Sequence, residues 1–446
     1  MSRTKDMTAG SPARLIVYFA VPLILANLGQ QLYMIVDAII VGKGVGVEAL
    51  ASVGAADWAY WLVLWIIQGL AQGFAIPVSQ AFGGNDRIQI RKTAAQIVQL
   101  CLVIGIVLTV VFLIAANPLL HILQTPEDVF AGTSAYLITM YGGILVVMAY
   151  NIASSVLRAL GDGKTPLIAI AVAAVTNILL DLLFVLVFHW GIVGAAVATV
   201  AAQFLAFVYC LLVLRKIEIM QIQKEDWKPD FKLISRLCRL GFPLALQMVM
   251  IAIGGMVLQS AINRQGFLFI AGFTATNKIY GLLESSAISL GYALTTYVAQ
   301  NYGAGFFDRI RKGMKISLII SIILSVCISV IMILGGSFLL RLFIDSSSPD
   351  APGVLQISRH YLFILSCFLS TLYLLHIFRN VLQGLGDTLA PFLSGVMEFA
   401  ARVTVALVFV RFWGREALFF AEPGAWILAM LLLIVMCIKR IKALPI

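Results

Sequence analysis

The chain has 446 residues, of which 61% are hydrophobic and only 12% are charged, and its mean hydropathy is +1.00. So few charged side chains cannot cover the surface of a water-soluble protein of this length, which excludes an ordinary soluble fold. The formal net charge of +10 would suggest nucleic acid as the partner of a soluble protein. In this chain the basic residues fall in alternate loops, so we expect no nucleic-acid partner.

Apolar runs long enough to cross a bilayer recur along the whole chain. A helix needs about 20 residues to span the hydrocarbon layer, and these runs lack the alternation of barrel strands. Charged and turn-forming breaks divide the chain into twelve predicted transmembrane helices, so we expect an all-α integral membrane protein. In chain order the helices are 14–41, 49–79, 93–116, 133–157, 166–188, 192–214, 235–262, 270–299, 315–340, 357–381, 390–411 and 420–438.

The basic residues predict the orientation of these helices. If the N-terminus lies inside, the inner segments hold 23 of the 31 Lys and Arg residues and the outer segments hold six. The other two, Lys278 and Arg402, lie within predicted helices. Because cytoplasmic loops carry an excess of Lys and Arg, we predict a multi-pass protein of the cell membrane (inner or plasma membrane), surrounded by lipids, with both termini in the cytoplasm.

Three short patterns occur twice at nearly constant separation, which indicates an internal duplication. We predict an N-terminal lobe of six helices at 1–214, a cytoplasmic linker at 215–232 and a C-terminal lobe of six helices at 233–446. Six is an even number, so the copies are parallel repeats related by a pseudo-twofold axis along the membrane normal. The patterns are Ala20-Val-Pro22 with Gly241-Phe-Pro243, Gln80-Ala-Phe-Gly-Gly84 with Gln300-Asn-Tyr-Gly-Ala304, and the Gly-Asp segments that end at Pro166 and Pro391.

No motif in the chain predicts catalysis or a bound cofactor. Gly163-Lys164-Thr165 resembles the end of a nucleotide-binding loop, but Arg158 stands where that loop requires a glycine. The six cysteines lack C-x-x-C spacing, and the four histidines are scattered over unrelated segments. We therefore predict a secondary transporter that acts as a monomer, with no cofactor and no resident metal, and not an enzyme.

Several ionisable residues fall within predicted helices, where each costs at least ~2.5–3.5 kcal/mol. Glu398 and Arg402 are four residues apart, so they can neutralise each other on one helix face. Lys278 and Glu284 are six apart, roughly 120° around their helix, so they cannot pair simply within it. A functional role for these two residues stays open. Asp57 lies closer to the outer end of its helix and can reach the membrane interface.

Asp37 and Asp181 have no cation within one helical turn of them. Gln30 and Tyr33 share a helix face with Asp37, and Asn177 shares a face with Asp181. A carboxylate among amide and hydroxyl groups in a low dielectric can take up a proton or bind Na⁺ through its oxygens. We therefore predict coupling chemistry at this pair. The alternative, protonated aspartates that only hydrogen-bond backbone carbonyls, stays open.

The twelve spans, the duplication, the paired Gln-x-aromatic-Gly-small turns and the paired Gly-Asp-x-x-x-Pro segments resemble the MATE family of drug and toxin extruders over 15–438. The predicted helices 235–262 and 357–381 contain no acidic residue, unlike those of the NorM-type branch, so the chain is more similar to the DinF-type branch. The resemblance implies a cation-coupling site in the N-terminal lobe, and a bend of the first helix at Pro22 when its aspartate is protonated. The implied site residues are Asp37, Asn177, Asp181 and Thr199.

The resemblance also implies antiport, with H⁺ or Na⁺ as the coupling ion and small cationic or amphiphilic drugs as substrates. Methionine, aromatic and charged side chains suit such substrates. The candidate cavity residues are Gln30, Tyr33, Met34, Met148, Met248, Met256, Lys278, Tyr280 and Glu284. A flippase for a lipid-linked oligosaccharide or cell-wall precursor is the alternative. Its cavity should carry several unpaired Arg or Lys residues, and only Lys278 and Arg402 qualify.

Overall fold

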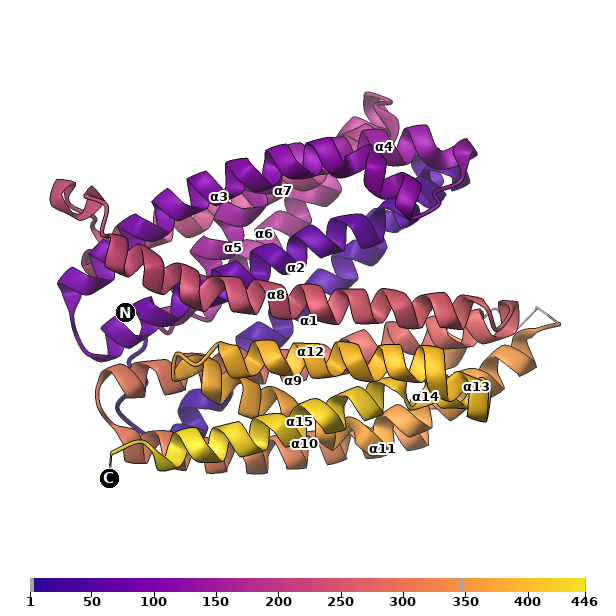
Figure 1. Ribbon diagram of the computed structural model, residues 1–446. Coiled ribbons are helices and arrows are strands. Elements are labelled where there is room, and N and C mark those ends of the chain that lie inside the picture. The colour runs from indigo at the N-terminus through magenta and orange to yellow at the C-terminus, as the bar shows by residue number, and fades with distance from the viewer. Residues whose placement is uncertain (1–3, 343, 345–348, 446) are drawn as a thin grey trace. The chain divides into compact units, whose positions relative to one another are not determined.

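The computed structural model describes residues 4–342, 344 and 349–445, apart from the side chains at 32–35, 37–39, 42–43, 47 and 50. Long helices joined by short connections make up this part of the chain (Figure 1). The helices of the first half are α1 (Pro12–Gly44), α2 (Val47–Gly83), α3 (Arg87–Ile122), α4 (Glu127–Gly142), α5 (Ile144–Ala159), α6 (Lys164–Asp181), its π-helical continuation η1 (Leu182–Val187) and α7 (Gly191–Lys216).

The connection to the second half contains two short 3₁₀ turns, η2 (Glu218–Met220) and η3 (Lys224–Trp227). The second half repeats the pattern of the first. Its helices are α8 (Phe231–Asn263), α9 (Phe267–Gly303), α10 (Phe307–Arg341), α11 (Ala351–Gly384), α12 (Leu389–Thr404), its π-helical continuation η4 (Val405–Phe409), the short α13 (Val410–Trp413) and α14 (Glu416–Phe419), and α15 (Ala421–Lys442).

Every predicted span overlaps one helix or a set of consecutive helices of the described chain. Ten helices are long and apolar enough to cross a membrane, and the bent pair α4 and α5 makes an eleventh span. The remaining prediction, 270–299, falls within α9, a helix of 37 residues with several polar side chains. A helix of that length exceeds the ~20 residues that a bilayer requires.

The predicted helix 133–157 is two helices in the structure, α4 and α5, which meet at an angle of 50° at Gly143. A Cβ atom on Gly143 would lie 2.5 Å from Cγ2 of Val200 in α7. Glycine therefore allows the close approach of α7 at this point. It also supplies the backbone freedom at which helices commonly bend.

The duplication predicted from the sequence is visible in matching contacts. Thr133 Oγ1 donates a hydrogen bond to the Ser52 carbonyl at 3.2 Å, and Ser358 Oγ donates to the Gly272 carbonyl at 3.1 Å. These two pairs are related by the same offsets as the sequence patterns, 225 and 220 residues. The two copies therefore share helix packing as well as sequence.

The turns at the start of α6 and α12 match in the same way. Gly161 and Gly386 both have a φ of 80°, in the left-handed region that favours glycine. The following aspartates each cap the next helix: Asp162 Oδ1 accepts from the Thr165 N–H at 2.9 Å, and Asp387 Oδ1 accepts from the Ala390 N–H at 3.2 Å. The recurring Gly-Asp segments are therefore helix starts.

The chain forms two compact units. The first contains Met1–Met7 and Val21–Ala245, and the second contains Thr8–Ala20 and Leu246–Ile446. Both α1 and α8 therefore contribute one part to each unit. The units differ in this respect from the predicted lobes, which assign each of these helices to one lobe as a whole.

The divisions inside α1 and α8 fall within three residues of Pro22 and Pro243. A proline inside a helix removes one backbone hydrogen bond and crowds the preceding turn. Both helices nevertheless continue through their proline as single elements of 33 residues. The predicted bend at Pro22 stays a prediction.

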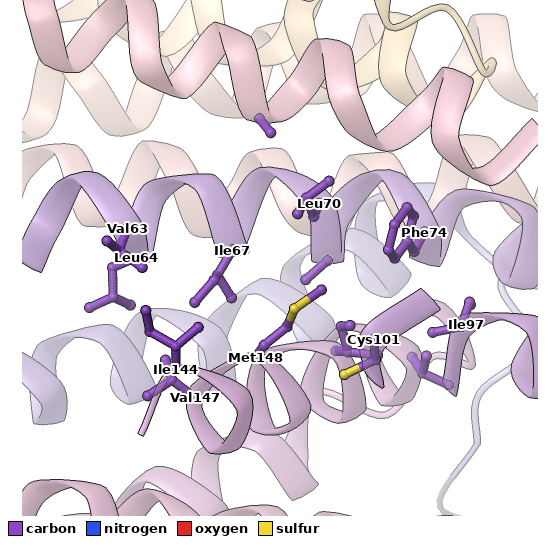
Figure 2. Packing of buried hydrophobic residues seen from close by; sticks show 14 of the residues in the cluster. Val63, Leu64, Ile67, Leu70, Phe74, Ile97, Cys101, Ile144, Val147 and Met148 are labelled. Carbon is purple, nitrogen blue, oxygen red and sulfur yellow. The ribbon is translucent and has the colours of Figure 1, made fainter. Parts of the chain in front are cut away.

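The interior of the first unit is a layer of apolar side chains from α2, α3 and α5 (Figure 2). Ile67 and Phe74 of α2, Met148 of α5 and Ile97 of α3 belong to this layer, and all four are at most 1% exposed. Between lipid-embedded helices this packing stabilises the fold mainly through van der Waals contact, because lipid is as apolar as the side chains themselves.

Small residues set the closest approach between α2 and the first part of α8. Gly69 and Gly73 form a G-x-x-x-G pattern on α2, and they face Ala245 and Gly241 on α8. A Cβ atom on Gly73 would lie 2.4 Å from the Gly241 Cα atom, and one on Gly69 would lie 2.6 Å from the Ala245 Cα atom. The backbones are thus in direct contact, as in other small-x-x-x-small helix pairs.

Replacement of Gly73 by alanine should therefore destabilise the protein, by about 1–3 kcal/mol, because the new methyl group meets backbone that cannot rotate away. On the same helix, a Cβ atom added to Gly54 would meet no other atom within 4 Å. Gly54→Ala should stabilise the helix by up to about 1 kcal/mol. Heating in detergent followed by size-exclusion chromatography measures the melting temperatures of both variants. Equal melting temperatures of the two variants would contradict the close approach.

Candidate functional site

Two helices of the first unit carry the polar residues that the sequence predicted. Asn177 and Asp181 lie one turn apart near the end of α6, and both are buried, with exposures of 2% and 0%. The Asn177 Nδ2 atom donates a hydrogen bond to Thr199 Oγ1 of α7 at 3.3 Å. The structure thus brings Asn177 and Thr199 into contact and places Asp181 on the same helix face as Asn177.

The face of α7 explains how such short side chains can meet. Its buried positions are small residues, including Gly194, Ala195, Ala198 and Ala202. Small residues let neighbouring helix backbones approach closely. Thr199 therefore reaches the Asn177 amide of α6 directly.

The arrangement offers oxygen atoms to a small cation. Within the described part of the chain, Asn177 Oδ1 is buried without a hydrogen-bond partner. It lies next to the Thr199 hydroxyl and one turn from the Asp181 carboxyl group. Carboxylate, amide and hydroxyl oxygens are ligands for hard cations such as Na⁺, and the carboxylate is also a site for a proton.

The remaining predicted member of this site is Asp37. Its backbone lies in α1, but its side chain, like those of Tyr33 and Met34, is outside the described residues. Its predicted role is therefore neither supported nor contradicted.

The helix that carries Asp181 changes geometry immediately after it. α6 ends at Asp181 and continues as the π-helical η1, and α12 likewise continues as the π-helical η4. π-helical turns occur frequently at functional sites. Nothing in the residue composition of these segments indicated them.

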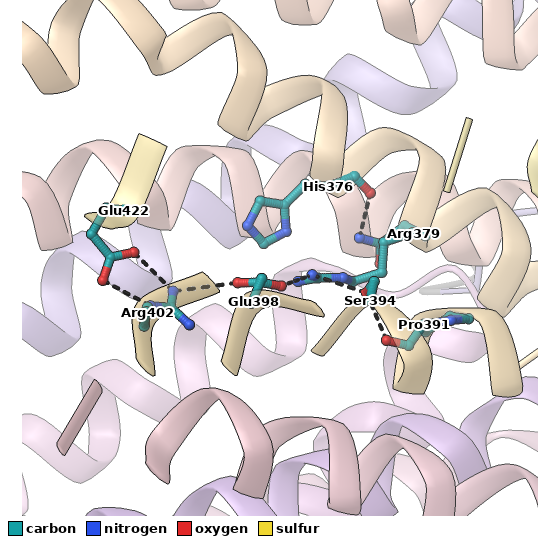
Figure 3. A network of polar contacts seen from close by, with 8 residues as sticks. His376, Arg379, Pro391, Ser394, Glu398, Arg402 and Glu422 are labelled. Atoms are coloured by element: carbon teal, nitrogen blue, oxygen red, sulfur yellow. Dashed lines mark hydrogen bonds and ion pairs between the residues drawn. The ribbon is translucent and has the colours of Figure 1, made fainter. Parts of the chain in front are cut away.

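The second unit contains a chain of buried ion pairs (Figure 3). Arg402 of α12 binds Glu422 of α15 through two nitrogens, with Nη2 at 2.8 Å and Nε at 3.0 Å from the carboxylate oxygens. The same Nη2 atom lies 3.3 Å from Glu398 Oε2. Glu398 in turn pairs with Arg379 of α11. Arg379, Glu398 and Arg402 have side chains at most 6% exposed, so the network is shielded from solvent.

These contacts confirm the predicted pairing of Glu398 with Arg402 and extend it. Arg379 is one of the 23 basic residues that the charge count assigns to inner segments, and in the structure it lies inside α11, near the end of that helix, and is 5% exposed. Its position near the end of an apolar run makes it look like an interfacial residue. The sequence does not single out Glu422, because it stands in the first turn of α15, where an acidic residue also stabilises a helix start.

The network occupies the position in the second repeat that the Asn177 region occupies in the first. With the offset of 225 residues, Arg402 corresponds to Asn177. In both repeats a π-helical turn follows shortly after this position. The first repeat therefore has an amide where the second has a guanidinium held by two carboxylates.

Glu284 and Tyr280 of α9 adjoin this network. Their side chains hydrogen-bond each other, and the charges that act on Glu284 include those of Glu422, Arg402 and Glu398. The Tyr280 ring stacks on Trp426 of α15, with the ring centroids 5.8 Å apart. Lys278, six residues before Glu284, is exposed.

The other predicted cavity residues lie in different surroundings. Met148 is 0% exposed within the packed core of the first unit. Its neighbours include Ile144 and Val147 (Figure 2). Gln30, Met248 and Met256 are partly exposed on their helices. Met148 thus packs in the core, and its predicted role in the cavity stays a prediction.

A sequence profile of the MatE family matches residues 22–183 and 243–408. The "Probable multidrug resistance protein YpnP" of Bacillus subtilis is 29% identical over 414 residues, which cover 93% of this chain and 92% of the relative. The "Probable multidrug resistance protein NorM" of Thermotoga maritima is 25% identical over 420 residues, or 92% of this chain and 88% of the relative. One matched segment falls within each of the two predicted repeats.

Among solved structures, a "Crystal structure of MATE in complex with MaL6" superposes on this chain with a TM-score of 0.90. The two sequences are 21% identical, and the match covers 98% of each chain. The similarity confirms the predicted fold class, an all-α membrane protein of twelve helices in two six-helix repeats.

The ion-pair network predicts that replacing a buried arginine lowers the stability of the protein much more than replacing a surface arginine. Arg402→Gln leaves Glu422 and Glu398 without their shared partner and should destabilise the protein by about 3–5 kcal/mol. Arg87 pairs with Glu218 at 3.5 Å on the surface, with side chains 60% and 82% exposed. Arg87→Gln should therefore cost at most about 1 kcal/mol. Thermal unfolding in detergent compares the two variants, and a similar loss in both would refute the buried network.

Proposed function

This chain belongs to the MatE family, and we propose that it is a secondary active antiporter that exports cationic or amphiphilic drugs and toxins in exchange for H⁺ or Na⁺. Members of the family are multi-pass membrane transporters, so the chain is a transporter and not an enzyme. The names of its relatives as multidrug resistance proteins support drugs as the substrate class.

The observation that carries the proposal is the buried group of Asn177, Asp181 and Thr199. An ionised carboxylate in a low dielectric is costly unless a cation compensates its charge. Asp181 therefore favours a bound H⁺ or Na⁺, while the Asn177 amide and the Thr199 hydroxyl fix the oxygen atoms around it. Asp37 of α1 is the proposed second carboxylate of this site.

Cation binding then couples to transport through a difference in affinity between two conformations. A ligand shifts a conformational equilibrium only by as much as its affinity differs between the two states. We propose that α1 provides this difference through a bend near Pro22, where one helical hydrogen bond is already missing. Because Asp37 lies in the same helix, a change in its charge acts directly on this element.

The flippase alternative finds less support. A pyrophosphate group would need positively charged residues that are free to bind it. Arg379 and Arg402 are neutralised by Glu398 and Glu422, so neither guanidinium is available for an anionic lipid. The absence of acidic residues from 246–263 and from α11 also supports coupling in the first unit, as in the DinF-type branch.

Efflux of a cationic dye from liposomes tests the coupling site. Asp181→Asn and Asp37→Asn should each abolish efflux driven by an imposed ΔpH or Na⁺ gradient, because asparagine cannot take up a proton or balance a cation. Asp86→Asn is the matched control, since Asp86 is an exposed N-cap and asparagine caps a helix equally well. Undiminished coupled efflux by Asp181→Asn would overturn the site, and comparison of the two gradients identifies the ion.

The proposed orientation places both termini in the cytoplasm. The last turn of α15 carries Lys439, Arg440 and Lys442, which favour the cytoplasmic side. Green fluorescent protein fused after the C-terminus should therefore fluoresce, whereas alkaline phosphatase fused there should be inactive. The reverse pattern would place the C-terminus outside.

A further inference from the structure

We propose that the second unit carries a proton-binding site of its own, in which Glu284 of α9 holds a proton at neutral pH. This site lies outside the proposed coupling site, which belongs entirely to α1, α6 and α7 of the first unit. Its ligand is a proton, and its partners are the Tyr280 hydroxyl and the ion-pair network of α11, α12 and α15.

The count of charges carries the inference. Three carboxyl groups meet in this region, Glu284, Glu398 and Glu422, whereas two guanidinium groups, Arg379 and Arg402, compensate them. With every group ionised, the cluster has an excess of one negative charge. Glu284 is half-buried beside the shielded ion pairs, where an excess charge is unfavourable, and uptake of one proton removes it.

The neighbouring helices contribute no further cation to this cluster. Residues 246–263 of α8 and 316–340 of α10 carry no charged side chain. On α11, His376 lies beside Arg379, whose positive charge disfavours a second cation at the imidazole, and Tyr361, which faces Glu422 and Arg402, has no cationic form. Lys278 of α9 is exposed and is not among the principal charges that act on Glu284.

The contacts indicate which carboxyl group holds the proton. Glu398 is engaged by two arginines, and Glu422 binds Arg402 through both of its oxygens. Both are therefore stabilised as carboxylates. Glu284 instead hydrogen-bonds the hydroxyl group of Tyr280, whose ring is held against Trp426. A proton on one Glu284 oxygen leaves the other to accept the bond from the hydroxyl group.

Infrared spectroscopy of the full-length protein in detergent, without substrate, tests the proposal. In protein labelled with ¹³C on the glutamate carboxyl groups, we expect one shifted carbonyl band of a protonated glutamic acid at neutral pH. Glutamates in water are ionised at this pH. The band should disappear in Glu284→Gln. Absence of the band from the wild type, or its persistence in Glu284→Gln, overturns the assignment.

A second variant tests the charge count itself. Glu422→Gln leaves two carboxyl groups against two guanidinium groups, so the band should be lost although Glu284 is still present. Persistence of the band in that variant overturns the charge-balance argument. Asp181→Asn is the control, because it carries no label and belongs to the other unit, so the band should remain. The measurement requires no transport, so its outcome is independent of whether the protein exports drugs.

Discussion

The cost of a charge in a low-dielectric interior is the constraint on which the polar architecture of this protein depends. Each buried ionisable group must find a partner, take up a proton or face water. The two repeats meet this requirement differently at equivalent positions. The first places the Asn177 amide and the Thr199 hydroxyl one helical turn from the Asp181 carboxyl group, and the second holds Arg402 between Glu398 and Glu422. The ion that we propose for the first arrangement is exchangeable, whereas the cation of the second is covalently part of the chain.

Close helix packing is what allows both arrangements to form. Short side chains such as Asn177 and Thr199 meet only because α7 presents small residues to its neighbours. The same principle acts at Gly73 and Gly241, where α2 and α8 touch through their backbones. Van der Waals contact between small residues thus fixes the scaffold, and the scaffold fixes the distances between polar atoms.

The sequence predicted the helices, the duplication and the one-turn spacing of Asn177 and Asp181 because each depends on local pattern. Features that depend on tertiary packing were harder to predict. The break between α4 and α5 falls at Gly143 inside a predicted span, where Val200 of α7, which is far away in sequence, approaches closely. Arg379 and Glu422 stand near helix ends, where charges are common, and only the packing of α11 and α15 shows that they meet α12. The π-helical turns have no compositional signal.

Because the two units share α1 and α8, a cut in the linker does not divide the protein into two complete units. A gene cut at the linker 215–232 encodes two fragments, and neither contains a complete unit. The first fragment lacks the part of α8 that ends at Ala245, and the second lacks Thr8–Ala20, which contains the start of α1. Each fragment therefore lacks a half-helix that the other one contains, so we expect neither fragment to form its unit alone. A single tandem gene supplies both halves together and in equal amounts.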